Sequence, residues 1–156
     1  MAGLVLSLRP YEKVLIGGVV VQNGASRTSL RVEAGAVGVL RMSDAMHPGD
    51  ARTPLTRCYY AAQLMLLGQG EAAVLERLLS DARAGFRGFA FGADLAAAEA
   101  AAREGAWFRV MRRLRPLLPQ EAALLSDPRF RPPDAVPDLP QAAMVMDAER
   151  TALTAG

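Results

Sequence analysis

The sequence predicts an α+β protein: a small antiparallel β-sheet or meander, then a bundle of three to four helices and a disordered, proline-rich tail. Residues 3–43 contain short alternating apolar segments separated by glycines and turn residues. Residues 51–125 carry apolar residues at helical spacing, and five of the ten prolines fall within 128–140. We therefore divide the chain into a β-rich module at 1–50, a helical module at 51–125 and a flexible tail at 126–156.

Four or five strands are expected in the β-rich module. The first two, at 4–8 and 14–16, flank an Arg-Pro bend and predict a charged opening hairpin. Asn23-Gly24 is a turn signal after a third apolar segment. The later strands are expected around 30–32 and 37–40. Such short strands need a partner surface to be stable.

The first helix begins at a clear start signal, Thr53 as N-cap and Pro54 at the first helical position. It is expected over 54–68 and is apolar nearly all round. Such a helix is buried or meets a partner. We expect burial on one side and a second copy or another protein on the other, where three apolar residues lie: Tyr60, Leu64 and Leu67.

Three more helices are expected, at 71–83, from Asp94 to 105, and at 106–118. Asp94 is the expected cap of the third helix. Pro116 should kink or end the fourth. Its expected inward residues are Trp107, Phe108, Met111, Leu114 and Leu118.

Charge is unevenly distributed along the 156 residues, although the net charge is only +2. Residues 1–57 hold seven cations against four acids, a surplus of three, whereas residues 121–156 hold three cations against six acids. A basic end is compatible with binding to nucleic acid or to an acidic partner, and also with ordinary solvation.

A single cysteine excludes an internal disulfide framework. Together with the lack of a membrane-length apolar run and of a signal peptide, it predicts a cytoplasmic protein without membrane contact.

Catalysis is not expected. His47, the one histidine, lies in a Pro-Gly turn, and Cys58 falls within the apolar helix. A metal site or a catalytic triad needs several converging ligands or a positioned base, which these two residues do not supply. Glycines at 85, 88 and 92 do not match a phosphate loop. We expect no enzyme activity and no cofactor.

Two groups of basic residues remain. Those on or beside the strands indicate either a sheet edge that is protected by charge or a surface that binds RNA. Composition alone supports these two explanations about equally. Arg109, Arg112 and Arg113 share a face of the fourth helix. Complementing the helix dipole is the favoured explanation for them, and anchoring phosphate or an acidic partner is the alternative.

Three stretches carry a family resemblance: "LVLSLRPYEKVLIGGVVVQNG", "HPGDARTPLTRCYYAAQLMLL" and "EGAWFRVMRRLRPLLPQEAAL". Over residues 4–125 the chain resembles the FlbT family, flagellin post-transcriptional regulators of α-proteobacteria. The resemblance implies action near the 5′ untranslated region of flagellin messenger RNA, repressing translation or promoting decay, although some members act positively. It also implies a FlaF-type partner linked to flagellin.

The opening is also similar to the carbon storage regulator family of RNA-binding proteins. Leu8-Arg9, then Leu15-Ile16-Gly17, and later Val39-Leu40-Arg41 carry this likeness. It implies RNA contacts at Arg9 and Arg41. Tyr11 departs from it by replacing a bend glycine, and Met42 by replacing an acid.

These observations lead to two hypotheses. The first is a flagellin messenger RNA regulator, with contacts at Arg9 and Arg41 supported by Lys13, Arg27 and Arg31. The second is an adaptor that binds a FlaF-type protein or flagellin and acts on the messenger RNA indirectly. Its contacts would come from the apolar helix, the arginines of the fourth helix and the tail.

Overall fold

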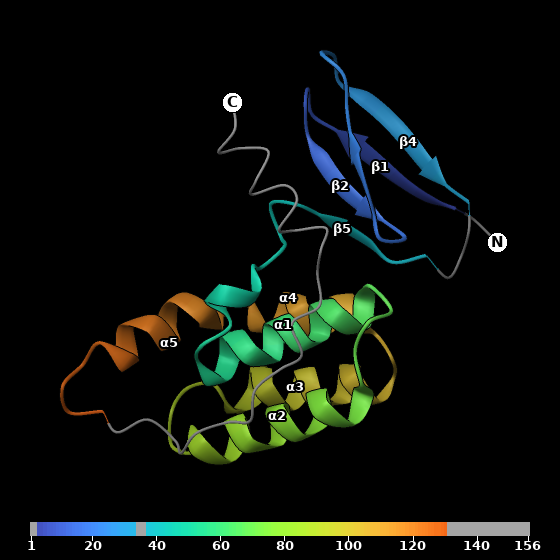
Figure 1. Cartoon of the computed structure of the whole chain (residues 1–156). Coiled ribbons are helices and arrows are strands. Elements are labelled where there is room, and N and C mark those ends of the chain that lie inside the picture. The colour runs from blue at the N-terminus through green and yellow to red at the C-terminus, as the bar shows by residue number, and fades with distance from the viewer. Residues whose placement is uncertain (1–2, 34–36, 131–156) are drawn as a thin grey trace. The chain divides into compact units, whose positions relative to one another are not determined.

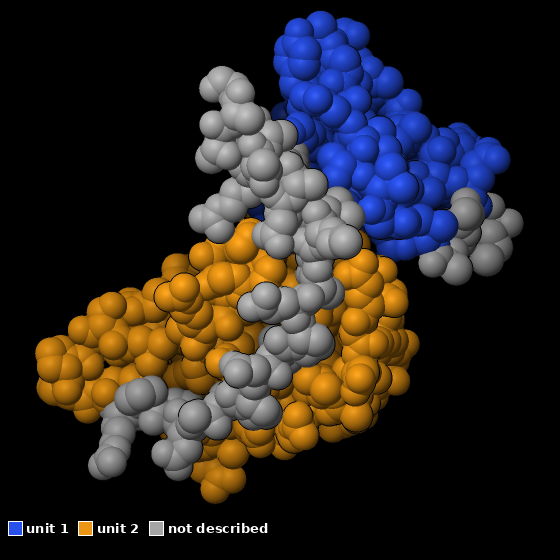
Figure 2. All heavy atoms as spheres, in the orientation of Figure 1, with its two compact units in different colours: residues 1–45, 143–156 blue, residues 46–142 orange. Residues whose placement is uncertain are grey.

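The computed structural model describes residues 3–33 and 37–130, and it forms two compact units (Figures 1 and 2). We call residues 3–45, without 34–36, the strand unit and residues 46–130 the helical unit, because the chain divides between Ala45 and Met46. Most of the expected tail, from residue 131 onward, lies outside the described residues. Each unit is considered by itself.

Five antiparallel strands in two small sheets form the strand unit (Figure 1). They are β1 (Leu4–Leu8), β2 (Lys13–Ile16), β3 (Val19–Gln22), β4 (Thr28–Val32) and β5 (Val39–Arg41). One sheet pairs β1 with β4, and the other has the order β3–β2–β5. The predicted α+β class is confirmed, but the opening hairpin is wrong, because β1 and β2 belong to different sheets.

The one tight hairpin of the described strands joins β2 to β3. Gly17 and Gly18 occupy its two turn positions with φ of 57° and 84°. Two consecutive left-handed residues match the twist of the flanking strands, and glycine reaches this conformation without steric cost. Asn23-Gly24 makes no such hairpin, since β3 and β4 are not paired. Inside the unit, Leu6, Leu8 and Val14 form a buried apolar cluster.

The helical unit contains five α-helices after a short 3₁₀ turn at Pro48–Asp50. They are α1 (Pro54–Leu66), α2 (Ala72–Gly85), α3 (Gly92–Arg103), α4 (Trp107–Leu114) and α5 (Leu117–Leu125). Thr53 caps α1 as predicted, and a capping box with Thr56 completes the start. In the described residues, no helix is both long and apolar enough to cross a membrane.

Two helix boundaries differ from the prediction. The expected fourth helix is divided at Pro116 into α4 and α5, which accounts for the extra helix. Pro119 lies in the first turn of α5, where its missing N–H removes no helical hydrogen bond. The cap of α3 is Phe91 rather than Asp94, which lies in the first turn and there complements the helix dipole.

Helix α1 is the central helix of its unit, because it packs against α2, α4 and α5. This explains its apolar residues on every side. Tyr60 and Leu64, expected to face a partner, are only 1% and 2% exposed, so that expectation is wrong for both. Leu67, at the end of the helix, is partly exposed.

Helix α4 also orients one aromatic residue unexpectedly. Phe108, predicted to face inward, is 46% exposed, while Val110, Met111 and Leu114 are buried. Val110, Met111 and Leu114 are one and three positions apart, so they lie on one face of the helix. Phe108 lies outside this face. Phe108 is therefore an exposed aromatic residue on a helix that also carries the predicted arginine cluster.

Buried polar side chains hold loops and helices of this unit together. Glu121 of α5 is 1% exposed, and its carboxylate accepts hydrogen bonds from the Thr53 hydroxyl and, at 2.8 Å, from the Leu55 N–H. It thus satisfies one of the free N–H groups at the start of α1. Gln63 binds both backbone groups of Met46, at 2.7 and 3.0 Å. Residues before the expected module boundary at 50 are thereby fastened to the helices.

Candidate nucleic-acid interface

A polar hollow of about 310 Å³ lies in the strand unit. We call it the arginine hollow; its lining residues are Ser7, Arg9, Glu12, Arg27, Arg41 and Ser43. Three of the five predicted RNA-binding residues are among them. The other three, Ser7, Glu12 and Ser43, were not predicted as site residues, although Glu12 lies within the charged bend of the opening segment.

Strand pairing brings these distant residues together. Arg41 ends β5 and lies opposite Val14 of β2, while Thr28, next to Arg27, lies opposite Leu8 of β1. The Asn23 side-chain amide joins the loops, donating to the carbonyls of Arg9 at 2.7 Å and Ser26 at 2.8 Å. Three separate segments, around residues 9, 27 and 41, are in this way fixed around one hollow.

Arg41 is held by two acceptors. Its Nη1 forms an ion pair with Oε1 of Glu12, and its Nη2 donates to the carbonyl of Ser7 at 3.1 Å. The second carboxylate oxygen of Glu12 accepts the Arg9 N–H at 2.8 Å. That backbone hydrogen bond, and then the bond from Arg41, hold the pKa of Glu12 below its ordinary value. Glu12 is therefore ionised at neutral pH.

The Arg9 and Arg27 side chains have no hydrogen-bond or ion-pair partner in the described part of the chain. The hollow thus holds three guanidinium groups against one carboxylate, a surplus of two positive charges. Guanidinium groups bind phosphate through parallel N–H donors. Converging, unpaired arginines of this kind make the hollow a candidate site for the phosphates of a nucleic acid.

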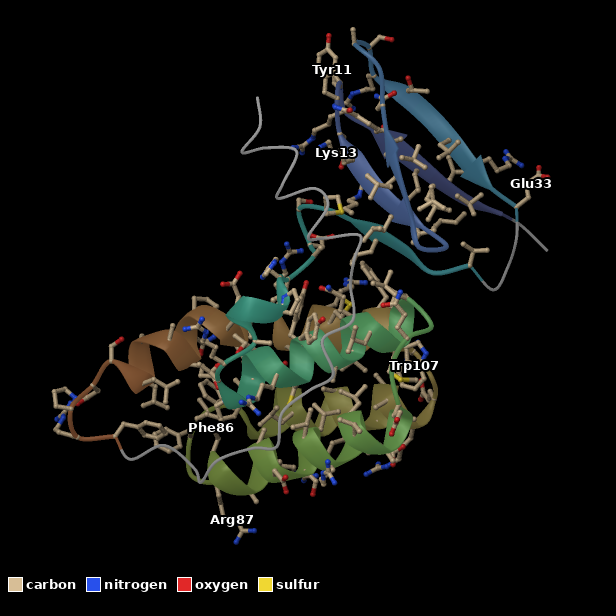
Figure 3. All side chains as sticks on the ribbon, in the orientation of Figure 1. Tyr11, Lys13, Glu33, Phe86, Arg87 and Trp107 are labelled. Carbon is tan, nitrogen blue, oxygen red and sulfur yellow. The ribbon has the colours of Figure 1, made fainter. Side chains whose placement is uncertain are left out.

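Tyr11, in the bend beside the hollow, is a further candidate. Its side chain is 63% exposed and points away from the strands (Figure 3). The residue has a φ of 59°, a left-handed conformation that favours glycine, and its N–H donates to the Gly24 carbonyl at 2.9 Å. An exposed ring next to unpaired arginines suits stacking on a base. The sequence contained one sign of this residue: Tyr11 stands where the carbon storage regulator family, which the opening resembles, has a glycine in the bend.

Two predicted RNA contacts do not line the hollow. Lys13 is opposite Gln22 on the β2–β3 pair. Arg31 is exposed on β4 opposite Val5, whereas its neighbours Leu30 and Val32 turn inward. Alternation along a strand puts successive side chains on opposite faces. These two cations remain candidate contacts outside the hollow.

The arginines of α4 are arranged differently. Arg109 pairs with Glu104 at 2.6 Å, and Arg113 approaches Asp94 at 4.0 Å. Arg112 is exposed between them, with no ion pair or hydrogen bond to its side chain in the described residues. Much of the charge of this cluster is thus offset by acids of the same unit.

The residues first considered for catalysis have structural roles. His47 caps the 3₁₀ turn by accepting the Gly49 N–H at 3.0 Å. Cys58 is buried in α1, and burial raises the pKa of its thiol far above the usual range. Within residues 3–33 and 37–130 no three His, Cys, Asp or Glu side chains are grouped as metal ligands.

Comparison with known proteins identifies relatives. Residues 4–125 match the family described as flagellar protein FlbT. The chain is 42% identical over 69 residues to a probable flagellum biosynthesis repressor protein FlbT of Caulobacter sp. K31, covering 44% of this chain and 52% of that protein, about half its length. It is 29% identical over 122 residues to a protein of the same description from Rhodopseudomonas palustris TIE-1, covering 78% of this chain and 96% of that one. No solved structure matches.

Proposed function

Because this chain belongs to the FlbT family of flagellar proteins, we propose that it represses flagellum biosynthesis after transcription, by binding the 5′ untranslated region of flagellin messenger RNA. Its relatives' descriptions as flagellum biosynthesis repressors support the regulatory part of this proposal. The RNA-binding part rests on the arginine hollow and on the resemblance of the opening to an RNA-binding family. Such a role requires neither an enzyme activity nor a cofactor and belongs in the cytoplasm.

The arginine hollow is the observation that carries the proposal. Two unpaired guanidinium groups, Arg9 and Arg27, and a third, Arg41, converge on one polar concavity. Successive phosphates of a single strand would bind there, with a base stacked on Tyr11 beside them. Because phosphate contacts release counterions, affinity should fall steeply as salt is raised.

The test replaces two hollow arginines together, Arg9→Ala and Arg27→Ala. Loss of two phosphate contacts should weaken binding to a flagellin leader RNA by about 100-fold, since each charge-assisted contact contributes about tenfold. The slope of log affinity against log salt should decrease by about 1.4. Binding is measured by fluorescence anisotropy over a salt series.

Arg77→Ala with Arg87→Ala provides the matched control. Both residues are exposed in the helical unit, and Arg87 points away from the helices (Figure 3). This double variant loses the same charge without touching the hollow, so its affinity should stay close to wild type. Equal weakening in both double variants would contradict a site at the hollow.

An adaptor is the second candidate function, and exposed Phe108 with neighbouring Arg112 favours it. An aromatic side chain exposed beside an arginine is typical of protein-binding surfaces. A FlaF-type protein or flagellin would then bind α4, and the messenger RNA would respond indirectly. High-salt pull-down with Phe108→Ala as bait, compared with wild type, separates the two: loss of the protein partner at unchanged RNA affinity assigns α4 to the adaptor role.

A further inference from the structure

One acid, Glu12, lies among the arginines of the hollow, and both of its carboxylate oxygens are already bound within the chain. The Glu12 side chain is 17% exposed, and its two oxygens accept from different donors, Arg41 and the Arg9 N–H. A phosphate has enough acceptor oxygens to bind the same guanidinium in place of this carboxylate. Glu12 therefore occupies, inside the chain, the place of an external anion.

We propose that Glu12 competes within the chain for the anion site, so that a phosphate of the bound RNA must displace its carboxylate from Arg41. This inference rests on the proposed function, since it takes RNA as the source of the phosphate. It adds a control element: the site is closed to weakly held anions and opens to a ligand that is already anchored.

The two unpaired arginines provide that anchor. Arg9 and Arg27 are exposed and without partners in the described residues, so they can take a first phosphate while the Glu12–Arg41 pair is intact. A second phosphate of the same strand is then delivered at high effective concentration beside Arg41. Like charges repel at such short range, and the carboxylate leaves as the phosphate binds.

Release of Glu12 is feasible because little else holds it. Both residues line the polar hollow, and the bend keeps its backbone hydrogen bond from Glu12 N–H to the Arg9 carbonyl, at 3.1 Å. The freed Arg9 N–H is in an exposed position and can bind water. Arg41 keeps its contact with the Ser7 carbonyl, at 3.1 Å, so the guanidinium stays in place for the incoming phosphate.

The experiment compares Glu12→Gln with Glu33→Gln. Both variants lose one negative charge from the strand unit, but Glu33 lies at the far end of β4 from the Tyr11 bend (Figure 3). Affinity for an unrelated single-stranded RNA and for inorganic pyrophosphate is measured over a salt series. Glu12→Gln should bind both about tenfold more tightly than wild type, because no carboxylate then has to be displaced from Arg41. Glu33→Gln should resemble wild type.

Other outcomes overturn the inference or separate it from the proposed function. Weaker binding by Glu12→Gln would show that the carboxylate positions Arg41 rather than competing, and equal effects in both variants would show a general charge effect. Tighter pyrophosphate binding by Glu12→Gln without RNA binding by either protein would uphold the competition and refute the RNA function. In the wild type, the ¹⁵N guanidinium signals of Arg41 should shift when the RNA saturates the protein; unchanged signals would also overturn the proposal.

Discussion

Glu12 in the strand unit and Glu121 in the helical unit make the same kind of contacts with opposite consequences. Each accepts hydrogen bonds from the backbone and from a side chain. The donor to Glu12 is a guanidinium, and the pKa of this carboxyl is lowered. The donor to Glu121 is a hydroxyl in a buried site, and burial raises the pKa of this carboxyl despite its hydrogen bonds.

The two units use their polar groups for different purposes. A carboxylate that is paired with an arginine in a polar surface hollow can be exchanged for another anion at small cost, because the arginine can pair with the incoming anion. A carboxylate without a cation in the interior cannot be exchanged and serves to join two helices. We therefore expect the polar groups of the strand unit to serve function and those of the helical unit to stabilise the fold.

The largest effect is expected from Glu121→Ala. Removing this carboxylate leaves the buried Leu55 N–H without an acceptor, which should lower the free energy of unfolding by about 1–3 kcal/mol. Urea denaturation measures the change. Glu121→Gln, whose amide oxygen can keep the Leu55 bond, should lose much less. Glu12→Ala should shift the urea midpoint less than Glu121→Ala; a larger shift would contradict the division of roles.

Acid should affect the two carboxylates with opposite signs. A lowered folded-state pKa gives stability that is present above the unfolded-state pKa and lost as the pH falls, so the advantage of wild type over Glu12→Gln should shrink in acid. A raised folded-state pKa gives stability that is present at low pH and lost as the pH rises, so wild type should gain on Glu121→Gln in acid. Denaturation between about pH 7 and pH 3 tests both. A pH dependence of the same sign for both carboxylates would contradict this prediction.

The smallest effect is expected at Tyr11, which shapes the bend that carries Glu12. Glycine relieves the left-handed backbone at some entropic cost, and the exposed ring loses little packing, so Tyr11→Gly should raise stability by less than about 1 kcal/mol. Tyr11→Ala, which keeps the steric cost, is the control and should be the less stable variant. A loss above about 1 kcal/mol on thermal unfolding of Tyr11→Gly would show that the ring packs.

The sequence predicted the helix start at Thr53, the break at Pro116 and the short strands closely. It also predicted Arg9, Arg27 and Arg41 as RNA contacts, from charge and resemblance rather than from geometry, but together with Lys13 and Arg31, which do not line the hollow. It missed the separation of β1 from β2, the burial of Tyr60 and the exposure of Phe108. These depend on which elements pack together, which periodicity in one segment does not specify.

Sequence alone determined the α+β class and local signals such as the start of α1 at Thr53, because caps, prolines and glycines act through neighbours within a few residues. Tertiary structure alone decided that β1 pairs with β4 and that β2 lies between β3 and β5. From that register follow the meeting of Arg9, Arg27 and Arg41 and the pairing of Glu12. The opposite pKa shifts of Glu12 and Glu121 have the same origin, since a carboxyl's titration is set by the distant groups and the solvent that the fold puts around it.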